Sequence, residues 1–476
     1  MNTAANQLSP AYDFGEGDTE ISLKRGTASI RVNGAWYHGD GDVKMKFLPM
    51  PKIYVHGLFE NVDIPFNAAV SCSLFRDEVP SFCFNDMAVE GYLGNPAPKE
   101  AGDGVVSLVW RPSITPIAVC GNDATTMIRA KFHVFNFLDF LYHNNKQNHH
   151  NEITLTGGGW EVELSPPNVT PENTKSPKEH NGYKLTHVGR IQKTGGSQFT
   201  GKDLEECLHA LGLVLSFARG DWCEPVCVKG YDESGECVWE KLSPPRSQSF
   251  RGNFRWFDEF HAEQLQPFFK CFMEKWKLDD WRNTLLHAIH WYLAANNEYP
   301  EAGIILAQAA LERLFHQVPV PEERQEKEDV PASKRFHKLF EHFNIPCDMP
   351  PYFPCLESIA DKKNWDAPRT LTEIRNFLTH PEDRQRILNA LDSAKLSVFD
   401  AYFEASNLYL WYLEMCILAA CGYEGNRLKR RWPREVEAVP WSSEPAPCVA
   451  KTCAPSSLAS NASCASPSAE PEQNQE

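Results

Sequence analysis

The chain has 476 residues, of which 42% are hydrophobic and 12% aromatic, and it carries a formal net charge of −16. A chain of this length exceeds a single hydrophobic core, so we expect two domains and an appendage. The acidic balance excludes a nonspecific nucleic-acid binder, because neutralising phosphates requires clustered lysine and arginine. Any RNA contact must therefore be local and lie within a cleft.

The sequence has the character expected of a cytoplasmic protein. No apolar run follows a basic start, so we expect no signal peptide. The longest apolar run, residues 408–420, is interrupted by Glu414 and is too short to span a bilayer. The 15 cysteines lack the spacing of a disulfide framework, which favours a reducing compartment. We expect no membrane contact.

Residues 1–245 are predicted to form a β-rich domain with a sandwich or barrel-like fold. Short runs rich in β-branched and aromatic residues are separated by Gly, Asn, Asp and Pro, which is typical of many short strands. The predicted strands cover 21–23, 28–32, 43–47, 52–55, 105–110, 126–134, 152–155, 160–164, 184–192, 226–228 and 237–239. Asn33-Gly34 and the GDGD sequence at 39–42 are both typical of hairpin turns.

One helix is predicted inside this domain, over residues 203–217, where leucines at helical spacing share one face and Gly220 ends the helix. Cys223, Cys227 and Cys237 follow it. They could hold zinc, but no second cysteine pair follows at a useful distance, so we favour structural or free thiols and predict no metal site.

Residues 255–425 are predicted to form an all-α domain, because the hydrophobic period becomes helical from Trp256 onward. The expected helices cover 259–276, 279–296, 301–316, 334–343, 355–360 and 370–379, followed by one long or kinked helix over 383–420. The fold class is therefore α+β, with a β-rich N-terminal domain followed by a helical bundle.

Two features at the C-terminal end carry further predictions. The final helix is apolar on all sides, which predicts a homodimer joined through the helical half. The apolar residues concerned are Leu408, Leu410, Trp411, Leu413, Met415 and Ile417. The basic residues from 427 to 434 are interpreted as a solvated helix end. Residues 432–476, rich in Ser, Ala, Pro and Glu, are predicted to be disordered.

The candidate catalytic residues are pairs of arginine and histidine separated by four to six residues. Such pairs occur five times, at Arg31/His38, Arg255/His261, Arg282/His287, Arg335/His342 and Arg375/His380. The composition of the chain produces about two by chance. Spacing alone therefore selects none of them.

The pair within LTEIRNFLTHPEDR, residues 371–384, is distinguished by its helix context. Ile374 and Phe377 are expected to anchor one helix face in the core. Arg375 and Asn376 are then left to face outward.

His380 is expected to lie at the end of this helix. It precedes Pro381, which disfavours α-helical backbone at the histidine. The negative end of the helix dipole favours a protonated imidazole there. Arg375 and His380 lie about 140° apart around a regular helix, so their convergence requires a local break or a second subunit.

A competing pair has the same RN-x3-H pattern. Arg282, Asn283 and His287 lie early in a predicted helix that continues beyond the histidine without a stop signal. We interpret His287 as a helix-surface or packing residue.

Two segments resemble the HEPN superfamily. The arginine-Asn-x3-His spacing at 375–380 resembles the R-x4-6-H signature of that superfamily, and residues 285–315 resemble the first helical hairpin of HEPN domains in the ApeA-like anti-phage group. Those proteins pair an N-terminal β-rich domain with a C-terminal HEPN domain, the order expected here. The resemblance implies a metal-independent endoribonuclease in abortive-infection defence, without a cofactor. It also implies that Arg375, Asn376 and His380 are catalytic.

These residue types suit RNA cleavage. A histidine with a pKa near neutrality can act as general acid or base. A guanidinium can hold two phosphate oxygens at once and stabilise the transition-state charge. The resemblance implies a 2′,3′-cyclic phosphate product. Glu312 is a candidate for orienting one of these groups, with an exposed helix charge as the alternative interpretation.

Two functions follow as hypotheses. The first is a dimeric HEPN endoribonuclease whose substrate is RNA, with tRNA as one candidate, and whose β-rich domain senses an unknown trigger. The second is a non-catalytic HEPN dimer that serves as a ligand- or nucleotide-binding sensor.

Overall fold

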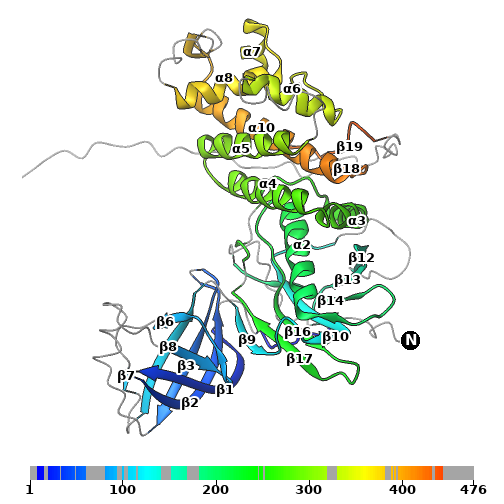
Figure 1. Cartoon of the computed structure of the whole chain (residues 1–476). Coiled ribbons are helices and arrows are strands. Elements are labelled where there is room, and N and C mark those ends of the chain that lie inside the picture. Colours follow the sequence, from blue (N-terminus) through cyan, green and yellow to red (C-terminus); the bar gives the residue numbers. More distant parts are fainter. Residues whose placement is uncertain are drawn as a thin grey trace, which may run out of the picture.

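The computed structural model combines two large β-sheets with a bundle of helices, which confirms the α+β prediction (Figure 1). It describes residues 8–14, 20–32, 34–48, 50–60, 81–93, 99–100, 105–113, 116–140, 152–168, 182–244, 246–249, 252–318, 330–380, 387–389, 391–392, 395–430 and 435–442. Among these residues, no helix combines the length and the apolar character needed to cross a bilayer.

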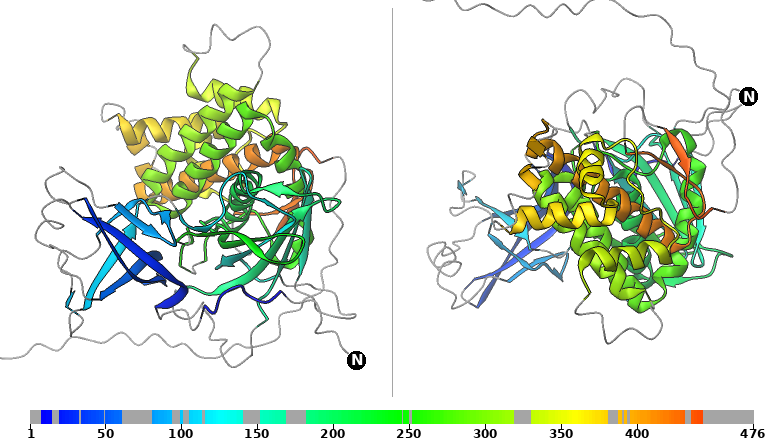
Figure 2. Two further views of the ribbon diagram at one scale, coloured as in Figure 1. Left: turned by 60° about the horizontal axis from the view of Figure 1, so that its bottom comes forward. Right: turned by 90° about the horizontal axis from the view of Figure 1, so that it is seen from above.

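The first sheet is antiparallel and runs in the order β5-β4-β1-β2-β3-β8-β6, with β7 also paired to β8. Its strands are β1 Ile21–Val32, β2 Ala35–Lys46, β3 Lys52–Glu60, β4 Ser81–Phe84, β5 Met87–Ala88, β6 Gly91–Leu93, β7 Lys99–Glu100 and β8 Val105–Pro112. It lies beside the second sheet (Figure 2), and its buried side chains form a hydrophobic core that also includes Phe135, Val226 and Leu242 of the second sheet.

The second sheet is also antiparallel and runs in the order β12-β13-β14-β11-β16-β17-β9. Its strands are β9 Ile117–Cys120, β11 Arg129–Phe135, β12 Ile153–Gly157, β13 Trp160–Ser165, β14 Leu185–Lys193, β16 Val226–Tyr231 and β17 Cys237–Leu242. Short pairs join β10 Thr126–Met127 to β15 Phe199–Thr200, and β18 Asn426–Leu428 to β19 Val436–Ala438.

The helices follow the sequence pattern closely. They are α2 Gly201–Arg219, the 3-10 helix η3 Glu259–Gln264, α3 Leu265–Trp276, α4 Asp279–Asn297, α5 Pro300–Gln317, α6 Ala332–His342, α7 Pro354–Lys363, α8 Ala367–Thr379 and α10 Val398–Cys421. A capping box between Thr200 and Asp203 begins α2, and Gly220, with φ of +77°, ends it as predicted.

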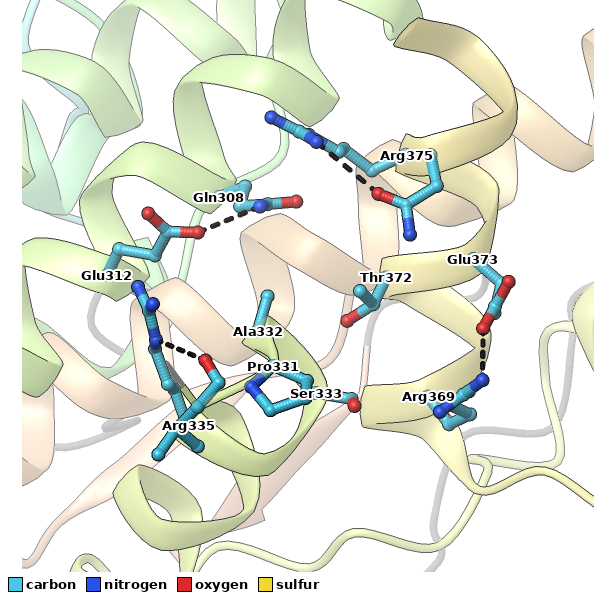
Figure 3. Close-up of a pocket in the computed structure, with 12 residues that line it drawn as sticks. Gln308, Glu312, Pro331, Ala332, Ser333, Arg335, Arg369, Thr372, Glu373 and Arg375 are labelled. Carbon is cyan, nitrogen blue, oxygen red and sulfur yellow. Dashed lines mark hydrogen bonds and ion pairs between the residues drawn. The ribbon is translucent and has the colours of Figure 1, made fainter. Parts of the chain in front are cut away.

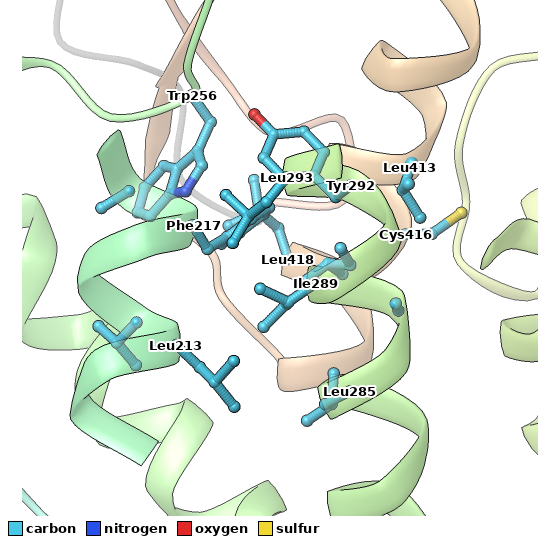
Figure 4. Close-up of a cluster of buried hydrophobic side chains, with 14 of the residues drawn as sticks. Leu213, Phe217, Trp256, Leu285, Ile289, Tyr292, Leu293, Leu413, Cys416 and Leu418 are labelled. Carbon is cyan, nitrogen blue, oxygen red and sulfur yellow. The ribbon is translucent and has the colours of Figure 1, made fainter. Parts of the chain in front are cut away.

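The hydrophobic core continues across the predicted domain boundary. Strand β17 ends at Leu242 and η3 begins at Glu259, so the change from strands to helices falls where expected. One cluster of buried side chains nevertheless extends from the second sheet into the helices. Helix α2 is the link, because its Phe217 packs against Trp256 and against Tyr292 of α4 (Figure 4).

Three expectations about local structure need correction. The GDGD sequence at 39–42 lies inside β2 and forms no turn. Gly41 pairs with Gly26 and Gly57 on the neighbouring strands, and the Phe84 ring lies so close to Gly41 that a Cβ there would be 3.0 Å away. Glycine is needed here for close packing.

The final helix is shorter than expected. Lys395 has a φ of +58°, and Ser397 caps α10 by accepting a hydrogen bond from the Asp400 amide at 3.1 Å. Helix α10 therefore begins at Val398. The parts of the prediction that cover residues 383–386, 390, 393 and 394 lie outside the described residues.

Two arginines of the basic cluster are buried, and part of the predicted tail is folded. Arg427 and Arg430 are 0% and 3% exposed, because both pair with Glu414 inside the core. Strand β19 pairs with β18, and Val439 is buried, so residues 435–442 are ordered. Residues 443–476 lie outside the described residues.

The apolar faces of α10 are covered by the same chain. All six apolar residues that motivated the dimer prediction are buried against neighbouring helices of the monomer. The centre of α10 is therefore no surface for a second subunit, and the reason given for the dimer is wrong.

Two buried histidines, His133 and His187, lie in the second sheet. Burial lowers the pKa of His133 and of His187 to about 3. His133 accepts a hydrogen bond from the Ala11 amide and lies 3.0 Å from the Cys227 carbonyl, an arrangement that suits a neutral imidazole. The folded protein therefore keeps both rings uncharged at neutral pH.

We expect the free energy of unfolding to fall as the pH drops from about 6.5 toward 3. Over this window the unfolded chain binds protons that the folded chain excludes, which costs about 1.4 kcal/mol per pH unit for each histidine. Urea unfolding at pH 7 and pH 5 measures this slope. His187→Phe should flatten it, and the exposed His342→Gln should leave it unchanged. An equal slope in His187→Phe and the unsubstituted protein would contradict the assignment.

Candidate active site

Helix α8 carries the predicted catalytic residues. Asp366 caps it, because its carboxylate accepts a hydrogen bond from the Arg369 amide at 2.9 Å. Leu371, Ile374 and Phe377 are buried in the core on one face. Arg375 and Asn376, which follow Ile374, are half-buried on the other side of the helix, as the periodicity predicted.

Arg375 and Asn376 line a pocket of about 510 Å³ between α5, α6 and α8 (Figure 3). The pocket is polar, with several side chains able to bind an anion or a hydroxyl group. Its lining residues are Gln308, Glu312, Val330, Pro331, Ala332, Ser333, Arg335, Arg369, Thr372, Glu373, Arg375 and Asn376. The three arginines exceed the two glutamates by one positive charge, which favours an anionic ligand.

The charged side chains of the pocket differ in how firmly they are held. Arg369 pairs with Glu373 one turn away at 2.5 Å, so its charge is neutralised on the same helix. The Nη1 atom of Arg375 donates to the Asn376 side-chain oxygen at 3.3 Å. Figure 3 shows the Arg375 side chain reaching across the pocket toward α5. Arg375 is therefore well placed to meet a phosphate.

Glu312 is held in a fixed position on the α5 side of the pocket. The Gln308 amide nitrogen donates to Glu312 at 2.9 Å, and Gln308 accepts a hydrogen bond from the Tyr409 hydroxyl at 3.0 Å. Burial raises the pKa of Tyr409, with Glu312 adding to the effect and Arg375 opposing it. Tyr409 is therefore a neutral donor that fixes Gln308, and through it Glu312.

His380 lies at the end of α8 and outside the pocket lining. Its φ and ψ of −119° and 103° are extended, as expected before Pro381, and its amide donates to the Asn376 carbonyl at 2.7 Å. The side chain is exposed. The structure thus brings Arg375, Asn376 and Glu312 together but leaves His380 beyond them, and none of the described lining residues is a histidine.

The competing pair is occupied by structural contacts. The Arg282 Nε donates to the Trp276 carbonyl at 3.1 Å, and its Nη2 lies 3.5 Å from Asp279. His287 stacks against Trp291, with ring centroids 5.7 Å apart. The hydrogen bond from Arg282 to Trp276 joins α4 to α3, and the stacking of His287 within α4 agrees with its interpretation as a helix-surface or packing residue.

Several pocket residues were not singled out from the sequence. Arg335 belonged to one of the five arginine–histidine pairs but was set aside, because its partner His342 lies about two turns away. Arg369 and Thr372 lie at helical spacing from the predicted Asn376 on α8, and all three line the pocket. This spacing could have been used to predict that Arg369 and Thr372 belong to the site. The contribution of Gln308 could not be predicted from the sequence, because it depends on the packing of α5 against α10.

Two family models match this chain. The model of the YopA central domain matches residues 122–253, and the model of the YopA C-terminal domain matches residues 278–438. No solved structure matches the chain. The chain is 26% identical over 462 residues to the SPbeta prophage-derived uncharacterized protein YopA of Bacillus subtilis (strain 168), covering 91% of this chain and 97% of that protein. The chain is thus similar to YopA over nearly its whole length, and the α5–α6–α8 pocket lies within the match to the YopA C-terminal domain.

Proposed function

We propose that the protein is a metal-independent endoribonuclease of the HEPN type. The observation that carries the proposal is the polar pocket at α8, where Arg375 and Asn376 face a cavity with one excess positive charge. In an acidic protein, a local cavity of this kind can hold an RNA phosphate without a basic surface. The backbone turns away from the helix at His380, immediately beyond the pocket.

In the proposed reaction the ribose 2′-oxygen attacks the phosphorus while a histidine imidazole accepts its proton. The bond to the 5′-oxygen breaks, that oxygen receives a proton from a protonated imidazole, and a 2′,3′-cyclic phosphate remains. Arg375 binds the non-bridging oxygens, whose charge grows in the transition state. His380 supplies the proton transfer. Glu312 orients the arginine or the substrate hydroxyl.

The position of His380 favours a homodimer. One Arg375/His380 pair does not share a pocket within a single chain, and a second copy against α8 would bring two pairs to one groove. Phe399 and Phe403 are 60% and 48% exposed at the start of α10, which packs on α8. We assign the subunit contact to these two rings.

Light scattering at micromolar concentration should give a dimer mass. Changing both Phe399 and Phe403 to serine should shift it to the monomer, because the exposed apolar contact is lost. Trp36→Ser, which alters an exposed ring in the first sheet, is the control and should leave the dimer intact. A monomer mass for the unsubstituted protein would contradict this part of the proposal.

The alternative is a non-catalytic sensor that binds an anionic ligand in the same pocket. The exposure of His380 outside the lining favours it. Incubating the purified protein with total RNA, with and without EDTA, distinguishes the two proposed functions. Cleavage that survives EDTA and disappears in Arg375→Ala supports the nuclease. RNA binding without cleavage, both for the free protein and during phage infection, supports the sensor.

We place the proposed activity in the cytoplasm, in anti-phage defence. The prophage origin in the relative's name supports a connection with phage biology. The β-rich region would sense the trigger, and α2 would transmit it, because α2 packs on both the second sheet and α4.

A further inference from the structure

Strands β9 and β17 bring together two thiols and a carboxylate far from the α8 pocket in sequence. The ligand atoms of Cys120, Cys237 and Glu240 all lie within 4.8 Å of one another. Glu240 is directly opposite Cys120 in the antiparallel ladder, and an irregularity follows it at Lys241. Two hydrogen-bonded strands therefore fix the position of all three groups.

The three metal-binding candidates differ in their exposure to solvent. Glu240 is 1% exposed, Cys120 is half-buried and Cys237 is exposed, so a small ion can reach the thiols from solvent. The Glu240 carboxylate accepts hydrogen bonds from the Tyr12 hydroxyl at 2.8 Å and from Lys24 at 3.0 Å. Tyr12 thus holds one carboxylate oxygen in place.

We propose that Cys120, Cys237 and Glu240 bind one thiophilic divalent cation, with Zn²⁺ as the natural candidate. Two thiolates and a carboxylate are a donor set that zinc accepts, and water completes the tetrahedron. Two sulfurs on one zinc, each at about 2.3 Å, require only a small approach from the present geometry. This proposal does not depend on the nuclease proposal.

Two lysines, Lys24 and Lys229, lie beside Glu240, and neither blocks the ion. Zinc displaces the two thiol protons, so the net charge of the group is the same before and after binding. The Lys24 side chain is 37% exposed and can turn toward solvent, which frees the second Glu240 oxygen. Lys229 pairs with the other oxygen, the one that Tyr12 binds, at 3.6 Å. The Tyr12 hydrogen bond then remains as the contact that orients the carboxylate.

The location assigns the metal a structural role. Strand β9 is the edge strand of the second sheet and comes next in the chain after β8 of the first sheet. A metal that links β9 to β17 would stabilise the connection between β8 of the first sheet and β9 of the second. The set considered from sequence, Cys223 with Cys227 and Cys237, is not the one that the fold assembles, because the buried Cys223 thiol donates to the Phe135 carbonyl at 3.2 Å.

Cobalt titration of the reduced, chelator-treated full chain tests the proposal. Co²⁺ should produce a sulfur-to-cobalt charge-transfer band with one ion per chain, and Zn²⁺ should abolish the band and raise the melting temperature. Cys120→Ser and Cys237→Ser should each weaken Co²⁺ binding at least tenfold, with metal-free melting temperatures unchanged. Cys83→Ser, which alters a half-buried thiol in the first sheet, should bind normally.

Three results would overturn it. One is the absence of the band in the unsubstituted chain. Another is an unchanged band in Cys237→Ser. The third is a Cys120–Cys237 disulfide found by peptide mapping in protein that takes up no metal after reduction.

Discussion

Replacing Glu414 with alanine is expected to lower the free energy of unfolding by about 3 to 5 kcal/mol, enough to unfold much of the helical half. Glu414 is fully buried in α10 and binds three partners. Its carboxylate lies 2.7 Å from Arg427 and 2.6 Å from Arg430, and it accepts a hydrogen bond from the Tyr292 hydroxyl at 2.7 Å. Without Glu414, the buried Arg430 loses this counter-charge, and Arg427 keeps only its pair with the partly exposed Glu437.

Glu437→Ala is a matched control that tests whether the burial of the carboxylate, and not only its charge, determines the loss of stability. Glu437 also pairs with Arg427, at 2.9 Å, but is 29% exposed. Glu437→Ala should cost about 1 kcal/mol or less, because solvent can replace the lost partner. Urea unfolding followed by circular dichroism measures both variants. A loss below about 1 kcal/mol in Glu414→Ala would contradict the account of this cluster.

Arg375→Lys is expected to reduce RNA cleavage as severely as Arg375→Ala, by about 100-fold or more. An ammonium group cannot make the paired contacts that a guanidinium makes with two phosphate oxygens. Initial rates on a defined RNA at saturating protein measure the loss. The melting temperature should stay within a few degrees, because the Arg375 side chain is only half-buried and, among the described residues, hydrogen-bonds to its neighbour Asn376.

Arg369→Lys is the control within the same pocket. Arg369 pairs with Glu373, and lysine can keep that ion pair, so cleavage should stay within a few-fold of the unsubstituted rate. If Arg369→Lys lost as much activity as Arg375→Lys, the phosphate contact would be shared or misplaced. If Arg375→Lys stayed active, the bidentate role would be wrong.

The helical half was the most predictable part of the fold. Periodicity located α4 and α5 to within a residue or so at each end, and the glycine signal at Gly220 marked the end of α2. Prediction failed where packing decides the outcome. The glycines of β2 signalled a turn, but they permit the Phe84 ring to lie against the strand.

Contacts distant in sequence account for the other errors. An apolar helix interrupted by one carboxylate gave no indication that Arg427 and Arg430 return to neutralise Glu414. The same contact changed a supposed solvated helix end into part of the core. Neighbouring helices of the same chain also cover the apolar faces of α10, which the sequence could not reveal.

The candidate site was partly predictable. Helical spacing correctly placed Arg375 and Asn376 on an outward face, and Pro381 correctly indicated extended backbone at His380. The pocket itself depends on α5 and α6, which approach α8 only in three dimensions. Sequence spacing could not show that His380 lies outside the lining.

The central claim is that the Arg375/His380 pair, and not the Arg282/His287 pair, cleaves RNA. The most direct measurement compares RNA cleavage in EDTA by His380→Ala and His287→Ala, with the melting temperature of each. We predict that His380→Ala is inactive and folded, because an exposed residue at a helix end packs little. His287→Ala should retain cleavage, or lose it only together with stability. A folded but inactive His287→Ala beside an active His380→Ala would contradict the claim.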